Sequence, residues 1–271
     1  MGLSDASIAL PIVLGALLSG CGPSGHTLEA ALDIKPAGKG HSGLKWRDHD
    51  PVPITGKQPN QFAVHGIDIS RYNERIDWRV ARKAGVSFAF IKATEGKDDR
   101  DPEFRRWWRE AGRSGIPRSA YHFYYFCATP GAQAANYINA VPKSDKSLPP
   151  ILDVEWNSKS PTCKKRPSAA RVRSVLKAWL NRIERHYGQK PIIYTTVDFY
   201  ADNLSKGGLP GYQYWLRSVR TEPKYKYPGR PWVFWQYTGS GSVPGVAGEV
   251  DINVFNGSRA SWKRWVSRNS R

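Results

Sequence analysis

The chain predicts an α/β fold, an irregular TIM-like (β/α) barrel of eight strands with helices mainly after the first five. Two observations predict it. Strand-like and helix-like segments alternate from about residue 62 to residue 204, and this alternation implies right-handed crossovers and a parallel sheet. Acidic residues also follow several of the predicted strands, and the carboxyl ends of strands carry the chemistry of such barrels.

Each predicted strand is a short apolar segment, and each of the first four precedes a segment of helical periodicity. The strands span 62–70, 86–94, 117–126, 149–156, 190–196, 212–219, 232–239 and 249–256. The helices span 74–85, 101–115, 130–142, 167–188, 197–204 and 258–266. Pro102 lies near the start of the second helix and Gly115 lies at its end. Proline is favoured at the first turn of a helix and glycine just after the last. After the short fifth helix the alternation decays, so the last strands follow one another through loops.

Residues 1–21 predict a targeting segment, because "IALPIVLGALLSGC" is a short apolar run that ends in small residues and a cysteine. The run is too short to span a membrane. Its end is similar to a bacterial lipoprotein box, in which Cys21 is acylated and anchors the mature protein. The preceding residues hold no Lys or Arg and include Asp5, so a cleaved signal without lipid is the alternative. We expect an exported protein of the bacterial cell envelope, anchored by lipid or otherwise periplasmic or secreted.

Residues 22–61 are rich in Gly, Pro, Lys and His and show little periodicity, so they predict a flexible linker. Residues 62–271 then form the barrel that carries the predicted catalytic site. The formal net charge of +18 favours anionic partners such as anionic lipid or an acidic cell-wall polymer. The basic residues are scattered, and neither a basic stripe nor a recognised module predicts nucleic-acid binding. Eleven tryptophans and thirteen tyrosines suit stacking on sugar rings.

Two carboxylates stand one residue apart in "LPPILDVEWN", residues 148–157. Residues i and i+2 of a strand share a face about 6.5–7 Å apart, so Asp153 and Glu155 point the same way. Two like charges at that distance raise one pKa, and a carboxyl group that stays protonated near neutral pH can act as a general acid. The motif alone also fits a solvated strand end or a helix N-cap.

Further charged residues converge with this pair if the barrel closes. Asp68 ends the first strand and Asp251 lies in the last, its neighbour, while the fourth strand faces them across the mouth. Lys92 lies inside an apolar strand and needs an anionic partner. Four carboxylates can hold magnesium or calcium, but the lysine and the lack of ligating histidines favour a site with no metal and no cofactor. For each residue alone, a structural salt bridge is the alternative.

Two cysteines lie within the predicted barrel. Cys127 and Cys163 each follow a predicted strand by a few residues, which places both on one rim of the fold. In an exported protein they can form a disulfide. Two free, buried thiols are the alternative.

Seven segments together resemble the glycoside hydrolase family 25 lysozymes. They are "HGIDISRYNERIDW", "FAFIKATEG", "AYHFYYF", "PPILDVEW", "KPIIYTT", "WQYTGSGSVPG" and "VDINVFNG". The resemblance runs from about His65 to Asn256, and the ordered set is more specific than any one motif. It implies an irregular β/α barrel that cleaves the β-1,4 bond between N-acetylmuramic acid and N-acetylglucosamine in peptidoglycan. The partner it implies is peptidoglycan, and we expect a monomer.

The resemblance also assigns roles by position. Glu155 matches the general acid of the family, and the other active-site acids match Asp153, Asp68 and Asp251. The expected substrate-binding residues are Lys92, Tyr194, Trp235 and Tyr124. Asn73 departs from the family, which often has Gln there. The implied mechanism is net retention with the substrate's 2-acetamido group as nucleophile, and the rival is a catalytically degenerate peptidoglycan-binding lipoprotein.

Overall fold

The computed structural model describes residues 46–144 and 146–270. All of these residues belong to one compact unit. The predicted targeting segment with Cys21 and most of the predicted linker therefore lie outside the described residues.

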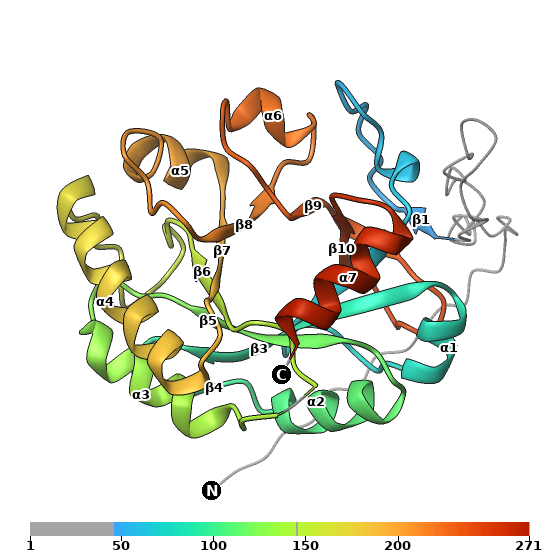
Figure 1. Cartoon of the computed structure of the whole chain (residues 1–271), viewed down its shortest axis with the longest axis horizontal. Coiled ribbons are helices and arrows are strands. Elements are labelled where there is room, and N and C mark those ends of the chain that lie inside the picture. The colour runs from blue at the N-terminus through green and yellow to red at the C-terminus, as the bar shows by residue number, and fades with distance from the viewer. Residues whose placement is uncertain (1–45, 145, 271) are drawn as a thin grey trace, which may run out of the picture. The chain divides into compact units, whose positions relative to one another are not determined.

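Eight strands close into a barrel, as the sequence predicts (Figure 1). In ring order they are β2 (His65–Ile69), β3 (Val86–Glu95), β5 (Arg118–Phe123), β6 (Ile151–Val154), β7 (Ile192–Thr195), β8 (Gln213–Arg217), β9 (Phe234–Ser242) and β10 (Val250–Phe255). Neighbours from β2 to β9 pair in parallel, and the β8–β9 pairing closes the ring. β10 runs antiparallel to both β9 and β2. The start of β10 therefore lies at the end of the barrel where the other strands finish.

Helices cover the barrel mainly after its first five strands, which confirms that prediction. They are α1 (Trp78–Lys83), α2 (Phe104–Arg113), α3 (Pro130–Ala140), α4 (Ala169–Tyr187), α5 (Val197–Asn203), α6 (Pro223–Lys226) and α7 (Arg259–Asn269). The longest, α4, starts where the Ser168 hydroxyl accepts from Arg171 N–H and ends at Gly188, whose φ of 66° is left-handed. Among the described residues, no helix is long and apolar enough to cross a membrane.

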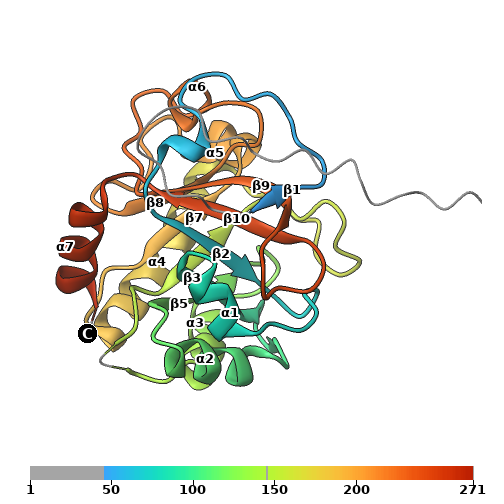
Figure 2. The same cartoon turned by 90° about the vertical axis from the view of Figure 1, so that its right-hand side faces the viewer.

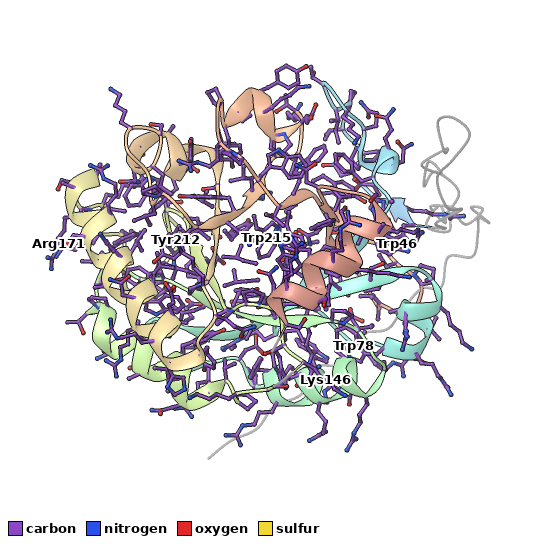
Figure 3. The ribbon with its side chains drawn as sticks, viewed as in Figure 1. Trp46, Trp78, Lys146, Arg171, Tyr212 and Trp215 are labelled. Atoms are coloured by element: carbon purple, nitrogen blue, oxygen red, sulfur yellow. A yellow bond between two sulfur atoms is a disulfide. The ribbon has the colours of Figure 1, made fainter. Side chains whose placement is uncertain are left out.

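The alternation of side chains along each strand divides the apolar core into two parts. The inner core fills the barrel and includes Phe88, Phe90, Trp215 and Phe234, and Trp215 lies near the centre of the view in Figure 3. The outer core lies between the strands and the surrounding helices. A strand residue therefore faces either the barrel interior or the helices, and one step along the chain changes its side.

Residues 46–61 pack against the barrel, although the sequence placed them in the linker. Trp46 is buried, and its indole N–H donates to Ala84 O at 2.9 Å. The short strand β1 (Arg47–Asp48) pairs with β9, and Thr55 pairs with Thr221. The packed domain thus begins no later than Trp46, because one indole and two backbone pairings supply contacts that a search for periodicity does not detect.

Candidate active site

The carboxyl ends of the barrel strands form a polar mouth above the inner core. On five of the strands a polar residue stands two positions after an inner-core residue and shares its face. The pairs are Phe90 and Lys92, Ile151 and Asp153, Ile192 and Tyr194, Trp215 and Arg217, and Phe234 and Gln236. Asp68 ends the same row of β2, and the reversed direction of β10 brings Asp251 opposite it. The four predicted acids come from three strands of this one end.

Asp68 and Asp251 form a carboxyl pair. They are direct cross-strand neighbours, and their side chains hydrogen-bond to each other. Two carboxyl groups can share a hydrogen bond only if one keeps a proton. Burial raises the pKa of Asp68 to about 6, opposed by two amide donors. Burial, followed by the charge of Asp68, raises the pKa of Asp251 well above its usual value.

Two amide side chains hold Asp68 in place. Gln236 Nε2 donates to Asp68 Oδ2 at 2.9 Å, and Asn253 Nδ2 donates to the same oxygen at 2.8 Å. Each amide is oriented in turn, because its oxygen accepts from a ring: Tyr194 O–H to Gln236 at 2.8 Å and Trp215 N–H to Asn253 at 2.7 Å.

The sequence reasoning missed both amides. The signal was present in the strand period: Asn253 stands two residues after Asp251, and Gln236 stands two residues after Phe234 in the inner row of β9.

Asp153 and Glu155 form the second acidic pair. Asp153 lies in β6 between Phe123 of β5 and Tyr194 of β7, and only 5 % of it is exposed. Its Oδ1 is buried and has no hydrogen-bond partner among the described residues. Burial, and then the charge of Glu155, raises the pKa of Asp153 well above its usual value.

Glu155 follows β6 directly and is half-buried. Its pKa is raised to about 7, mainly by burial, which the charge of Arg217 opposes and the charge of Asp198 supports. The sequence predicted a raised pKa caused by Asp153, whereas in the structure burial is the main cause and the acids that raise the pKa further are Asp198 and Asp68. Glu155 therefore holds a proton near neutral pH at an open end of the barrel, as a general acid requires.

Two cations balance the acids of the mouth. Lys92 Nζ lies 2.5 Å from Glu95 Oε2, so its closest anionic partner is a residue that the sequence reasoning did not single out. Tyr125 O–H donates to the other oxygen of Glu95. Arg217 is half-buried, and its guanidinium makes no ion pair within residues 46–144 and 146–270. Its charge lowers the pKa of Glu155 and of Asp251.

Residues 67–246 match the model of the glycosyl hydrolases family 25, a span that contains three of the four acids. The chain belongs to this family. It is therefore a glycoside hydrolase, and its barrel is the fold of the solved family members.

Individual relatives agree with this assignment. The chain is 31 % identical over 281 residues to Lysozyme M1 of Streptomyces globisporus, covering 96 % of this chain and 90 % of that protein. It is 40 % identical over 205 residues to YegX of Escherichia coli K12, covering 74 % and 72 %. A solved family 25 glycosyl hydrolase from Bacillus anthracis superposes with a TM-score of 0.68 at 34 % identity, covering 78 % of this chain and 96 % of that one.

Two aromatic residues expected to bind substrate do not reach the mouth of this family 25 barrel. Trp235 is fully buried in the outer core, and its indole N–H donates to Ser218 O at 2.7 Å. It lies one residue from Gln236, and a strand turns alternate residues to opposite faces. Tyr124 follows β5 and is likewise buried in the outer core. The prediction was wrong for both, because it counted aromatic residues at strand ends without applying the two-residue period.

A disulfide joins two loops at the mouth of the glycosidase. Cys127 follows β5 and Cys163 follows β6, and their sulfur atoms are bonded with a Cα–Cα distance of 5.8 Å. This is the pairing that the sequence favoured over two free thiols. The second loop begins with Glu155 and Trp156, and Trp156 Nε1 donates to Asp202 at 2.7 Å. The general-acid candidate thus lies at the base of a covalently tied loop.

Asn73, the departure from the family pattern, connects two loops. Its Oδ1 accepts from Ser70 N–H at 2.9 Å, and its Nδ2 donates to Glu249 O at 3.0 Å. The first bond shapes the turn after β2, and the second ties that turn to the loop before β10. Asn73 therefore positions the loops that follow Asp68 and precede Asp251.

Proposed function

We propose that this enzyme cleaves the β-1,4 bond between N-acetylmuramic acid and N-acetylglucosamine in peptidoglycan, with Glu155 as general acid. The observation that carries the proposal is the Glu155 carboxyl group, whose pKa burial raises to about 7 at the mouth, among three other acids. The names of the relatives support the substrate, since they include Lysozyme M1 and the N,O-diacetylmuramidase of Chalaropsis sp..

In the first step Glu155 donates its proton to the glycosidic oxygen as the bond from that oxygen to the anomeric carbon breaks. The carbonyl oxygen of the 2-acetamido group attacks the same carbon and forms a cyclic oxazolinium intermediate. In the second step the Glu155 carboxylate takes a proton from water, the water oxygen attacks the anomeric carbon, and the ring reopens. Two inversions at one carbon give net retention of configuration.

Asp153 orients the acetamido group in this scheme. Its buried Oδ1 has no donor among the described residues, and the acetamido N–H is a donor of the required kind. A hydrogen bond to the carboxylate form lowers the pKa of a carboxyl group. Substrate binding therefore favours the Asp153 carboxylate while Glu155 keeps its proton. The Asp68–Asp251 pair, held by Gln236 and Asn253, supplies negative potential to the developing cation.

The location of the enzyme is also part of the proposal. An enzyme that cuts cell-wall glycan acts outside the cytoplasm, and residues 1–21 have the pattern of an export signal with Cys21 as lipid acceptor. Replacing Cys21 with Ala should move a monomeric enzyme from the membrane fraction to the soluble envelope fraction. Unchanged fractionation would contradict the lipid anchor and leave the proposed reaction untouched.

Mass analysis of products from purified peptidoglycan tests the reaction. We expect fragments whose new reducing end is N-acetylmuramic acid, and Glu155→Gln should release almost none. Glu184→Gln, on the outer helix α4, is the matched control and should release wild-type amounts. A new reducing end on N-acetylglucosamine, or near-normal release by Glu155→Gln, would refute the proposal.

A further inference from the structure

A cleft lies on the outer wall of the barrel, and we call it the outer cleft. It encloses about 840 Å³ and is lined by the segment that enters α1, the last turn of α2 and the β9–β10 loop. Its principal lining residues are Arg75, Trp78, Arg79, Glu110, Arg113 and Val246. None of these takes part in the proposed reaction.

The outer cleft begins at the rim of the catalytic mouth. Two of its walls pair with each other, because Asp77 N–H donates to Gly245 O at 2.7 Å and Ala247 N–H donates to Arg75 O at 2.9 Å. The first wall continues the strand that ends in Asp68, and the second leads into the strand that begins beside Asp251. Figure 2 shows the β9–β10 loop beside α1. A chain bound at the mouth can therefore reach the cleft by crossing the rim.

The cations of the outer cleft are free to bind a ligand. Arg75, Arg79 and Arg113 are exposed, and their guanidinium groups donate no hydrogen bond and form no ion pair in the part of the chain that the structure describes. Guanidinium groups bind carboxylates through paired N–H donors. The nearby carboxylate of Asp77 already accepts hydrogen bonds from the backbone N–H groups of Arg79 and Val80. It is therefore only partly available to pair with these guanidinium groups.

The other lining groups narrow the ligand class. Glu110 adds an anionic side chain that would repel a polyanion and attract an ammonium group. Ile76, Trp78 and Val246 provide apolar surface. The indole N–H of Trp78 is buried without an acceptor among the described residues, and an oxygen at this wall would satisfy it. In Figure 3 Trp78 lies near α1 and α2. A ligand with carboxylates, an ammonium group, amide oxygens and small apolar side chains fits this set.

We propose that the outer cleft binds the peptide stem carried by the N-acetylmuramic acid residue whose bond is cut. This inference rests on the proposed function, because it needs that sugar at the mouth. A stem peptide has the required carboxylates, ammonium group and methyl side chains, and it leaves the sugar next to the rim. A phosphate-bearing polymer would match the arginines but not Glu110. The cleft thus makes peptide-bearing glycan the preferred substrate.

Turnover of two substrates tests the inference: intact peptidoglycan fragments, and the same glycan after enzymatic removal of its peptides. Wild-type enzyme should cleave both and have the lower KM for the peptide-bearing form. The double variant Arg79→Gln/Arg113→Gln should raise the KM for peptide-bearing glycan about tenfold, since two charge-assisted contacts are lost. It should leave kcat, and the KM for the peptide-free glycan, unchanged.

The double variant Arg105→Gln/Arg109→Gln is the matched control, since it removes two exposed charges from α2 that do not line the cleft. It should keep the wild-type preference. Equal KM values of wild-type enzyme for both substrates, or an equal loss in both double variants, would overturn the inference while the reaction itself stands. Failure of every form to cleave either glycan would refute the proposed function instead.

Discussion

The same strands build the inner core in the lower part of the barrel and the mouth at their carboxyl ends. The inner core is apolar, whereas the side chains of the mouth are polar or charged. In the lower part, the ring centroids of Phe90 and Phe234 lie 4.9 Å apart, and those of Phe88 and Phe234 lie 5.0 Å apart. Further along the same strands the side chains are polar or charged, and burial raises the pKa values of the acids among them. The lower part stabilises the fold by burying apolar area. Burial of the acids in the mouth costs stability, and it favours their protonated forms.

The largest expected effect lies in the mouth. Replacing Glu155 with Gln removes the proposed proton donor while leaving a side chain of the same shape, so kcat should fall by about 10³-fold, within the range for general-acid catalysis. The fold should persist, and a far-ultraviolet spectrum matching wild type would check it. A loss below tenfold would place the acid elsewhere in the mouth.

The lower part should respond in the opposite way. Phe90 is fully buried and contacts Phe88, Trp215 and Phe234, so Phe90→Ala should lower the free energy of unfolding by about 3–5 kcal/mol. Denaturant unfolding measures this change. Enzyme that stays folded should retain the wild-type pH profile, because no titrating group is removed. A cost under 1 kcal/mol would show that the lower part does not carry the stability assigned to it.

The pH dependence of stability sharpens the comparison. The pKa of Glu155 is about 7 in the folded state against 4.5 as its usual value, so the folded state binds more protons between these pH values. The contribution of this group to the free energy of unfolding is therefore largest below pH 4.5 and is lost as pH rises to about 7. A shift of this size corresponds to about 3 kcal/mol.

Glu155→Gln lacks that titration, so its stability relative to wild type should increase by about 3 kcal/mol between pH 4.5 and pH 8. Parallel urea titrations of the two proteins across this range measure the difference. Parallel curves for the two proteins would show that the burial of Glu155 costs nothing.

The smallest effect concerns the ring that orients Gln236. Tyr194→Phe removes the hydrogen bond to Gln236 Oε1 and lets the amide turn away from Asp68, which should lower kcat/KM about tenfold. Trp235→Phe, on the opposite face of β9, should leave kcat/KM within about twofold, although it weakens the outer core. Equal losses in the two variants would argue that the network acts only through stability.

Most of the barrel and the four acids were predictable because both depend on local patterns. Alternating strands and helices fix the topology, and Asp153 and Glu155 share a face by the strand period alone. The partners of these acids depend on register between distant strands, as with Asn253 and Asp68, 185 residues apart. Arg217 and Glu95 were missed for the same reason, since a charge near a strand end acquires meaning only when its neighbours are known.

The central claim is that the mouth keeps a proton on Glu155 near neutral pH, and titration of that carboxyl group by carbon-13 NMR tests it most directly. Comparison of wild-type spectra with those of Glu155→Gln assigns the resonance. The account predicts a midpoint near pH 7, because burial raises the pKa to about that value. A midpoint near 4.5, the usual pKa of a solvated glutamate, would contradict it.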